Sequence, residues 1–279
     1  MSKSDRLRPS DIWWAFRLIG DCRDLGNDPR LWHTRMLEGL AIVFGVVHAV
    51  ASEAWWHRPG PVVPPVSVHS VAAEAKAEEA FQAYLRAGAV VGDPVLGAIG
   101  KMPDPLVTRT RQELVTDTDW YRSATFNEYF NIGEIDHQIR SVCRVSQNGA
   151  TSRIALNRAL GDRDFSLRER RLLNFFHAEL GRLIGGPLVS ALEPNASQLS
   201  PRLRQTLDCL LEGHTEKQVA ARLGLSTATV HQYVMALYRH FGVQSRAQLI
   251  ARVLQRMPRP QLVSSMSRPR HRLQLAAKR

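Results

Sequence analysis

Side chains that can hydrogen-bond to base edges are concentrated in one short stretch, STATVHQYV, at residues 226–234. The amide of Gln232 carries a donor and an acceptor side by side, the pair that matches the major-groove edge of adenine. The hydroxyl of Thr229 can contact a base or a phosphate, and the cations Lys217 and Arg239 are suited to holding phosphates. These residue types are suited to contacts with nucleic acid, and the alternative for the stretch is a compact helical hairpin that contacts no DNA.

Helix start and stop signals divide residues 199–256 into four short predicted helices. A capping residue precedes each helix, and Gly224 supplies the tight turn before the third helix, which covers about 227–241. Apolar residues recur at helical spacing in each helix, so the four should pack into a small all-α bundle. The caps are Ser200 before Pro201, Thr215 with Gln218, Ser226, and Ser245 with Gln248.

Residues 199–252 resemble the LuxR/NarL-type helix-turn-helix domain of bacterial transcription regulators. The resemblance implies that the third helix lies in the major groove with its first turns facing base edges, where Ala228 and Met235 are further outward positions. The coinciding marks are Leu199-Ser200, Glu212-Gly213, Lys217, Val219-Ala220, Leu225-Ser226, Thr229-Val230, Gly242-Val243 and Ser245-Arg246. The residues expected to contact DNA are Lys217, Ser226, Thr227, Thr229, Val230, His231, Gln232 and Arg239.

Three positions depart from the usual pattern of that family. Leu203 stands where the family commonly has glutamate, His231 where it commonly has lysine, and Tyr233 where it commonly has histidine. Because a histidine with an ordinary pKa of about 6.5 is mostly uncharged near neutral pH, the reading surface is less cationic than usual. The target sequence of another family member therefore does not transfer to this chain. Each of the residues expected to contact DNA, His231 included, could instead lie on a helix face that is exposed to solvent and contacts no DNA.

The excess positive charge is confined to the last third of the chain. Residues 197–279 hold 14 basic and 3 acidic residues, whereas residues 1–196 hold 23 of each. This asymmetry predicts double-stranded DNA as the partner of the C-terminal part, with an anionic membrane surface as the weaker alternative. Residues 257–279 carry six basic residues, three prolines and no acidic residue, which predicts a disordered basic tail. The tail either adds nonspecific phosphate contacts or is solvated without a role.

Residues 10–186 predict an α+β domain with helices and an antiparallel sheet. The clearest signal is a hairpin over about 139–158, whose β-prone runs flank the two-residue turn Asn148-Gly149. The S-x-x-E box of Ser166 and Glu169 starts a long helix that should end at Gly185-Gly186. Further predicted elements are helices over 11–20 (capped by Asp11 or Ser10), 29–44 and 72–87, a strand in GVVHAVASEAWW, an exposed proline-rich loop over 58–66 and a connector over 187–198.

This first domain resembles, loosely, the GAF- and PAS-like sensor domains, over the stretch from WYRSATFNEYF to DFSLRERRLL. The resemblance implies a sensor or dimerisation role, in which a cavity above the sheet would hold a small molecule. Aromatic residues at such spacings more often form an ordinary core, so both interpretations stay open. The candidate lining residues are Trp120, Tyr121, Phe126, Tyr129 and Phe130.

Missing motifs argue against several classes of protein. The sequence contains no receiver-type acidic set, no Walker loop, no H-E-x-x-H and no G-x-S-x-G, so we expect no enzyme, no cofactor and no metal site. The three scattered cysteines, Cys22, Cys143 and Cys209, predict a reducing compartment. No signal peptide or membrane span is evident, so a cytoplasmic location is expected.

These observations together predict a sequence-specific DNA-binding transcription regulator that works as a homodimer. The resemblance places the dimer contact of the DNA-binding domain on the fourth helix, residues 246–255, and implies RNA polymerase as a further partner. A small-molecule signal or dimerisation would act through the N-terminal domain. Two alternatives remain, a nonspecific or architectural DNA-binding protein that depends on the basic tail, and an enzyme whose first domain acts on a small molecule.

Overall fold

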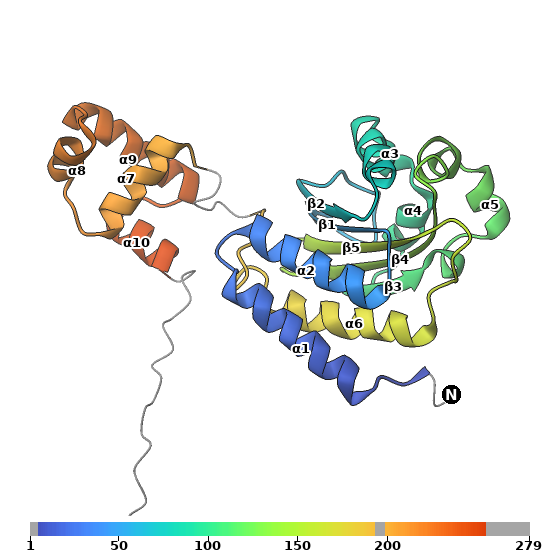
Figure 1. The fold of residues 1–279 in the computed structure, drawn as a ribbon. Coiled ribbons are helices and arrows are strands. Elements are labelled where there is room, and N and C mark those ends of the chain that lie inside the picture. Colours follow the sequence, from blue (N-terminus) through green and yellow to red (C-terminus); the bar gives the residue numbers. More distant parts are fainter. Residues whose placement is uncertain (1–4, 193–198, 255–279) are drawn as a thin grey trace, which may run out of the picture.

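The N-terminal domain is built on a five-stranded antiparallel sheet with the strand order β2-β1-β5-β4-β3 (Figure 1). The computed structural model describes residues 5–192 and 199–254. All four pairs of neighbouring strands are antiparallel. The strands are β1 (His48–Trp55), β2 (Ser67–Ala72), β3 (Leu106–Thr110), β4 (Ile135–Arg144) and β5 (Ala150–Ala159).

Helices cover both faces of this sheet (Figure 1). Side chains alternate along β5, so that Leu156 belongs to the core on one face while Arg153 and Ala155 line a cavity on the other. The predicted α+β class with an antiparallel sheet is confirmed. One face carries α1 (Pro9–Asp24), α2 (Pro29–Phe44) and α6 (Leu167–Gly181), and the other carries α3 (Ala75–Arg86), α4 (Pro94–Gly100) and α5 (Asp117–Arg122).

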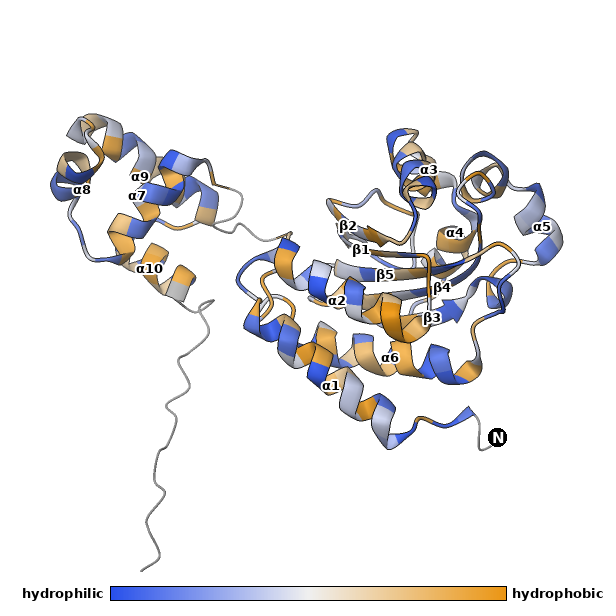
Figure 2. Cartoon of the chain, viewed as in Figure 1, coloured by the Kyte–Doolittle hydropathy of each residue, from blue (hydrophilic) through white to orange (hydrophobic). Residues whose placement is uncertain are grey.

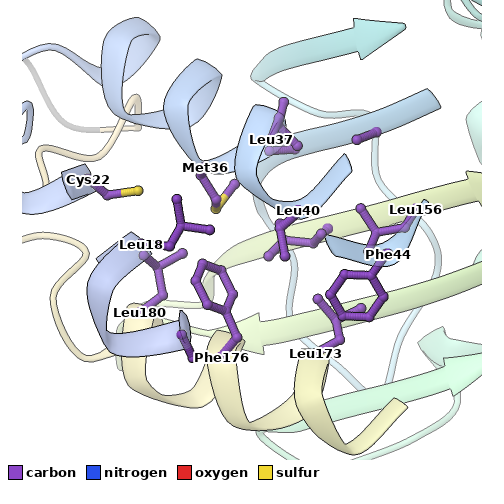
Figure 3. Close-up of a cluster of buried hydrophobic side chains, with 14 of the residues drawn as sticks. Leu18, Cys22, Met36, Leu37, Leu40, Phe44, Leu156, Leu173, Phe176 and Leu180 are labelled. Atoms are coloured by element: carbon purple, nitrogen blue, oxygen red, sulfur yellow. The ribbon is translucent and has the colours of Figure 1, made fainter. Parts of the chain in front are cut away.

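The main hydrophobic core lies between the sheet and the helices α1, α2 and α6 (Figure 3). Met36, Leu40 and Phe44 extend into it from α2 at the helical spacing seen in the sequence. Leu173 and Phe176 meet them from α6, and all five side chains are at most 1% exposed. Full burial of one such side chain is worth about 1.5–3 kcal/mol, so this core dominates the stability of the domain.

A buried polar network fixes α6 on the sheet. His177 is fully buried; its Nδ1 is hydrogen-bonded to the hydroxyl of Ser141 at 2.7 Å and its Nε2 to that of Ser152 at 3.1 Å. Ser141 is hydrogen-bonded in turn to the hydroxyl of Thr108 at 2.7 Å. Burial lowers the pKa of His177 to about 3, so the ring is neutral at physiological pH.

Several predicted elements are confirmed, with small differences at their ends. The helix over 29–44 is α2, and the carboxylate of Asp28 caps it by accepting the backbone N–H of Arg30 at 2.8 Å. The predicted hairpin is formed by β4 and β5. Its loop contains five residues, 145–149, instead of a two-residue turn, because β4 ends at Arg144 and β5 begins at Ala150.

Other predicted details are wrong. The first helix begins at Pro9, and Asp11 lies inside its first turn, where the carboxylate accepts the backbone N–H of Arg8 at 2.8 Å. The helix α6 ends at Gly181, because Ile184 beyond it forms a bridge with Leu188. Residues 58–66 are a loop as predicted, but Arg58 within it is buried. The strands β2 and β3 and the helices α4 and α5 lie where no element is predicted.

The start of the predicted connector is docked on the N-terminal domain. The indole N–H of Trp32 donates to the carbonyl of Val189 at 3.0 Å, and the backbone N–H of Val189 donates to the carbonyl of Gly26 at 2.8 Å. The hydroxyl of Ser190 donates to the buried carboxylate of Glu53 on β1. Residues 188–190 are therefore held by both α2 and the sheet.

The C-terminal domain consists of the four predicted helices. Leu207 of α7, Val219 of α8, Leu237 of α9 and Leu249 of α10 are at most 1% exposed and share one core. The predicted basic tail, 257–279, lies outside the described residues. The helices are α7 (Pro201–Leu211), α8 (Glu216–Leu223), α9 (Thr227–Phe241) and α10 (Arg246–Leu254).

Candidate nucleic-acid interface

Two capped helices joined by a glycine turn form the centre of the C-terminal domain. The amide oxygen of Gln218 accepts the backbone N–H of Thr215 at 2.8 Å, which completes the predicted capping box of α8. Gly224 ends α8 with φ of 66°, a left-handed conformation that glycine adopts without steric cost. The hydroxyl of Ser226 then accepts the backbone N–H of Thr229 at 3.1 Å and starts α9. Local sequence signals thus set where α8 ends and where α9 begins.

The buried side of α9 removes one residue from the expected contact surface. Val230 was expected to contact DNA, but its side chain is 0% exposed and packs in the core with Val219 of α8. Its apolar side chain stabilises the fold more when it is buried than when it is exposed to water. Val230 therefore positions α9 and is not part of the exposed surface.

The outward side of α9 presents polar side chains near its N-terminal end. Thr227 and Gln232 are exposed, as the sequence predicts. The half-buried Thr229 has its hydroxyl hydrogen-bonded to that of Ser226 at 2.8 Å, so this pair belongs to the helix cap. Met235 is 42% exposed and extends the same side toward the middle of the helix.

His231 is exposed but has a partner on the preceding helix. Its Nδ1 lies 3.1 Å from the Oε2 atom of Glu216 in the first turn of α8. The contact joins α8 to α9 across the turn and places a carboxylate beside the ring. Sequence reasoning missed this role of Glu216, because a spacing of 15 residues carries no local signal.

Two exposed cations flank this polar surface in the sequence. Lys217 is exposed in the first turn of α8, and Arg239 is exposed in the last turn of α9. Arg222 and Arg246 have structural partners instead, since Arg222 pairs with Glu212 and Arg246 donates to the carbonyl of Leu210 at 2.9 Å. Lys217 and Arg239 are thus better suited to hold phosphates than these other basic residues.

The N-terminal domain contains a second candidate site, a cavity of about 40 Å³ between the sheet and α3. Its polar lining includes Tyr84, Arg140 and Arg153, and its apolar lining includes Phe81 and Leu96. The hydroxyl of Tyr84 donates to the carboxylate of Asp93 at 2.8 Å, and burial raises the pKa of Tyr84 well above its usual value. Sequence reasoning missed this group, although Asp93-Pro94 repeats the cap-and-proline signal of Asp28-Pro29 and would have predicted α4.

The five aromatic candidates differ in burial and do not line one common cavity. Trp120, Phe126 and Phe130 are buried and belong to one hydrophobic cluster. This agrees with an ordinary core, the interpretation that the sequence favours. Tyr121 is 41% exposed and donates its hydroxyl to Asp136 at 2.8 Å. Tyr129 and Phe130 line a small cavity of about 10 Å³ next to α3.

The geometry of α8, the glycine turn and α9 defines a helix-turn-helix domain. Residues 197–253 match the model of the family described as bacterial regulatory proteins, luxR family. The C-terminal domain is therefore a LuxR-type helix-turn-helix domain, as the resemblance predicts, and this is a family of regulatory proteins. The match covers about a fifth of the chain and leaves the N-terminal domain without a family assignment.

Two solved structures of SdiA show low similarity to the whole chain. For Escherichia coli SdiA the sequence identity is 14%, the TM-score is 0.36, and the alignment covers 80% of this chain and 92% of SdiA. For SdiA in complex with octanoyl-rac-glycerol the sequence identity is 14% and the TM-score is 0.40. That alignment covers 88% of this chain and 95% of SdiA. No curated protein matches the chain.

No helix within residues 5–192 or 199–254 has the length and apolar character required to cross a membrane. The GAF- or PAS-like character of the N-terminal domain stays a prediction.

Proposed function

We propose that this protein is a sequence-specific transcription regulator that binds DNA as a homodimer and responds to a small molecule through its N-terminal domain. The observation that carries the proposal is the exposed polar side of α9 on a LuxR-type domain. The charge asymmetry of the chain supports it, because the basic excess lies in the part that would meet DNA.

In the proposed complex, the N-terminal half of α9 enters the major groove. Gln232 reads adenine through its amide, and Thr227 with the Ser226–Thr229 pair contacts a base or the backbone. Lys217 and Arg239 hold phosphates. His231 contributes less than these residues, because the neighbouring Glu216 carboxylate repels the phosphate backbone.

A selection of binding sites from a random DNA library at about physiological salt tests this proposal. The full-length protein is compared with a version that ends at residue 256. A shared inverted repeat in both versions supports a specific dimeric regulator. Absence of any motif, together with loss of binding on truncation, favours the second candidate function, nonspecific binding through the six basic residues of 257–279.

A matched pair of variants tests the reading surface itself. Gln232→Ala should relax the preference at one base position and weaken binding to the selected site by about 5- to 150-fold, the value of one good bidentate contact. Gln205→Ala removes another exposed amide, from α7, and should leave the base preference and the affinity unchanged. Equal effects of the two variants would contradict the assignment of Gln232.

The proposed homodimer has a candidate surface on α1 and α2. Trp13, Phe16 and Ile42 are 64%, 53% and 80% exposed, although all three are large and apolar. They lie at one end of the helix pair, where the rings of Trp14 and Phe44 are 6.5 Å apart, and Figure 2 shows the end of α2 as hydrophobic. Exposed apolar surface of this kind marks protein–protein contacts.

Sedimentation of a Trp13→Glu/Phe16→Glu variant tests this surface. We expect a monomer, whereas Val91→Glu, which changes a 56% exposed residue of the segment Ala89–Gly92, should keep the wild-type mass. A double variant that sediments like the wild type would remove the α1–α2 surface from the proposal.

A further inference from the structure

Three arginines are buried on or beside the sheet face that α3 covers. Arg58, Arg140 and Arg153 are at most 9% exposed. Among the residues that the structure describes, Asp93 is the one carboxylate within ion-pair distance of this group, with its Oδ2 atom 3.4 Å from Nη2 of Arg140. This region of the protein therefore carries more buried positive than negative charge.

Among the residues that the structure describes, Arg153 is the clearest case of a buried cation without a counter-ion. Both of its terminal nitrogens donate to the carbonyl of Val63 at 3.1 Å, and its guanidinium carbon lies 4.6 Å from the ring centre of Trp56. Its Nε has no hydrogen-bond partner among the described residues. Burial lowers the pKa of Arg153 to about 10. Buried charges in proteins are ordinarily paired, so this arrangement lacks an anion.

Arg158 on the same strand shows what a satisfied buried arginine looks like in this domain. It is 2% exposed, lies 2.7 Å from the carboxylate of Glu169 and donates to the carbonyl of Phe44 at 2.7 Å. Arg153 has no such carboxylate among the described residues. The difference between the two residues therefore concerns charge compensation and not burial.

Arg153 and Arg140 both line the cavity of about 40 Å³. One water needs roughly 10–15 Å³ by this measure, so the space holds about three heavy atoms, the size of a carboxylate group. The remaining walls are largely apolar and include Phe81. Phe81 and Tyr84 also line the neighbouring cavity beside Phe130, so these two side chains form a wall that the two spaces share.

We propose that this cavity binds a small monocarboxylate with an unbranched apolar chain. The carboxylate pairs with Arg153 and Arg140, and the chain displaces the half-buried Phe81 toward Phe130. A single negative charge fits because the two lining guanidiniums and Asp93 leave one positive charge in excess. A planar carboxylate also matches the fork of a guanidinium. The inference rests on the proposed sensor role of the N-terminal domain and names the class of its ligand.

Thermal unfolding of the full-length protein with hexanoate, and with its neutral analogue hexanamide, tests the proposal. Tryptophan fluorescence is the readout, since all six tryptophans lie at or before residue 120. Hexanoate at a hundredfold excess over its Kd should raise the Tm of the N-terminal domain by roughly 5–10 °C. Hexanamide should bind at least tenfold more weakly. Equal shifts from both compounds, or no shift from any saturated monocarboxylate between acetate and decanoate, would overturn the proposal.

Two variants separate a binding role of Arg153 from a structural one. Arg153→Met should abolish the response to hexanoate without lowering the Tm of the ligand-free protein, because it removes an uncompensated buried charge. Arg158→Met should lower the Tm, because it removes the buried partner of Glu169 and the hydrogen bond to the carbonyl of Phe44. If Arg153→Met and Arg153→Gln both destabilise as Arg158→Met does, Arg153 is structural and the proposal fails. DNA binding by the wild type is measured separately, so failure of the regulator function is distinguishable.

Discussion

The buried His177 gives the N-terminal domain a stability that depends on pH in a calculable way. The pKa of a histidine in the unfolded chain is about 6.5, and burial lowers that of His177 to about 3 in the folded protein. Below pH 6.5 the unfolded chain therefore takes up a proton that the folded protein does not. The contribution of His177 to stability is complete above pH 6.5 and is lost as the pH falls. With these two pKa values, the loss is about 2 kcal/mol at pH 5 and about 4 kcal/mol at pH 3.

His177→Gln isolates this contribution, because an amide can hydrogen-bond to Ser141 and Ser152 but does not titrate in this range. Urea unfolding followed by tryptophan fluorescence gives the free energy of unfolding of the N-terminal domain at pH 8 and pH 5. The variant should be less stable at pH 8, and its difference from the wild type should shrink by about 2 kcal/mol at pH 5. The control His57→Gln changes an exposed histidine and should follow the wild type. An unchanged difference between wild type and His177→Gln at the two pH values would refute the argument, since His177 would then accept a proton within the fold.

Two further predictions concern the DNA-binding domain and the first helix. Lys217→Ala and Arg239→Ala should each weaken binding to all sequences alike and lower the slope of log K against log salt concentration by about 1, measured by fluorescence anisotropy; an effect on one base position would contradict a phosphate contact. Gly224→Ala should destabilise the C-terminal domain by about 1–2 kcal/mol because of the positive φ, as followed by circular dichroism. Gly20→Ala, with no atom within 4 Å of the new methyl group, should instead stabilise α1 by about 0.5–1 kcal/mol; the opposite sign for either glycine would refute the conformational reasoning.

The C-terminal domain was more predictable from sequence than the N-terminal domain. Its helices start at side chains that cap their own backbone, as Ser226 and Thr215 do, and end at glycines such as Gly224. These signals act over three or four residues, so they are visible in the sequence. The strands β2 and β3 depend on partners far along the chain, and their short runs, SVHSVA and LVTRT, carry no strong pattern of their own.

In the candidate sites, too, features set by local sequence could be predicted, and features that depend on tertiary packing could not. The exposure of Gln232 and Thr227 follows from helical spacing, and the burial of Val230 follows from the same spacing, since Val230 and Val234 lie one turn apart. The pairing of His231 with Glu216 could not be predicted in this way, because it depends on the angle between α8 and α9. The burial of Arg140 and Arg153 could not be predicted either, because it depends on the register of β4 and β5. This register places both side chains on the face opposite the main core.

The docking of Val189 and Ser190 limits how far the C-terminal domain can lie from the N-terminal domain. Seven residue steps separate Leu192 from Leu199, and they span at most about 25 Å when fully extended. Tethering within such a radius corresponds to an effective concentration on the order of 10 mM. In a dimer joined through the N-terminal domains, the second DNA-binding domain would meet its half-site, about 34 Å from the first, as an intramolecular event. Modest affinity of each domain alone would then suffice for tight binding of the pair.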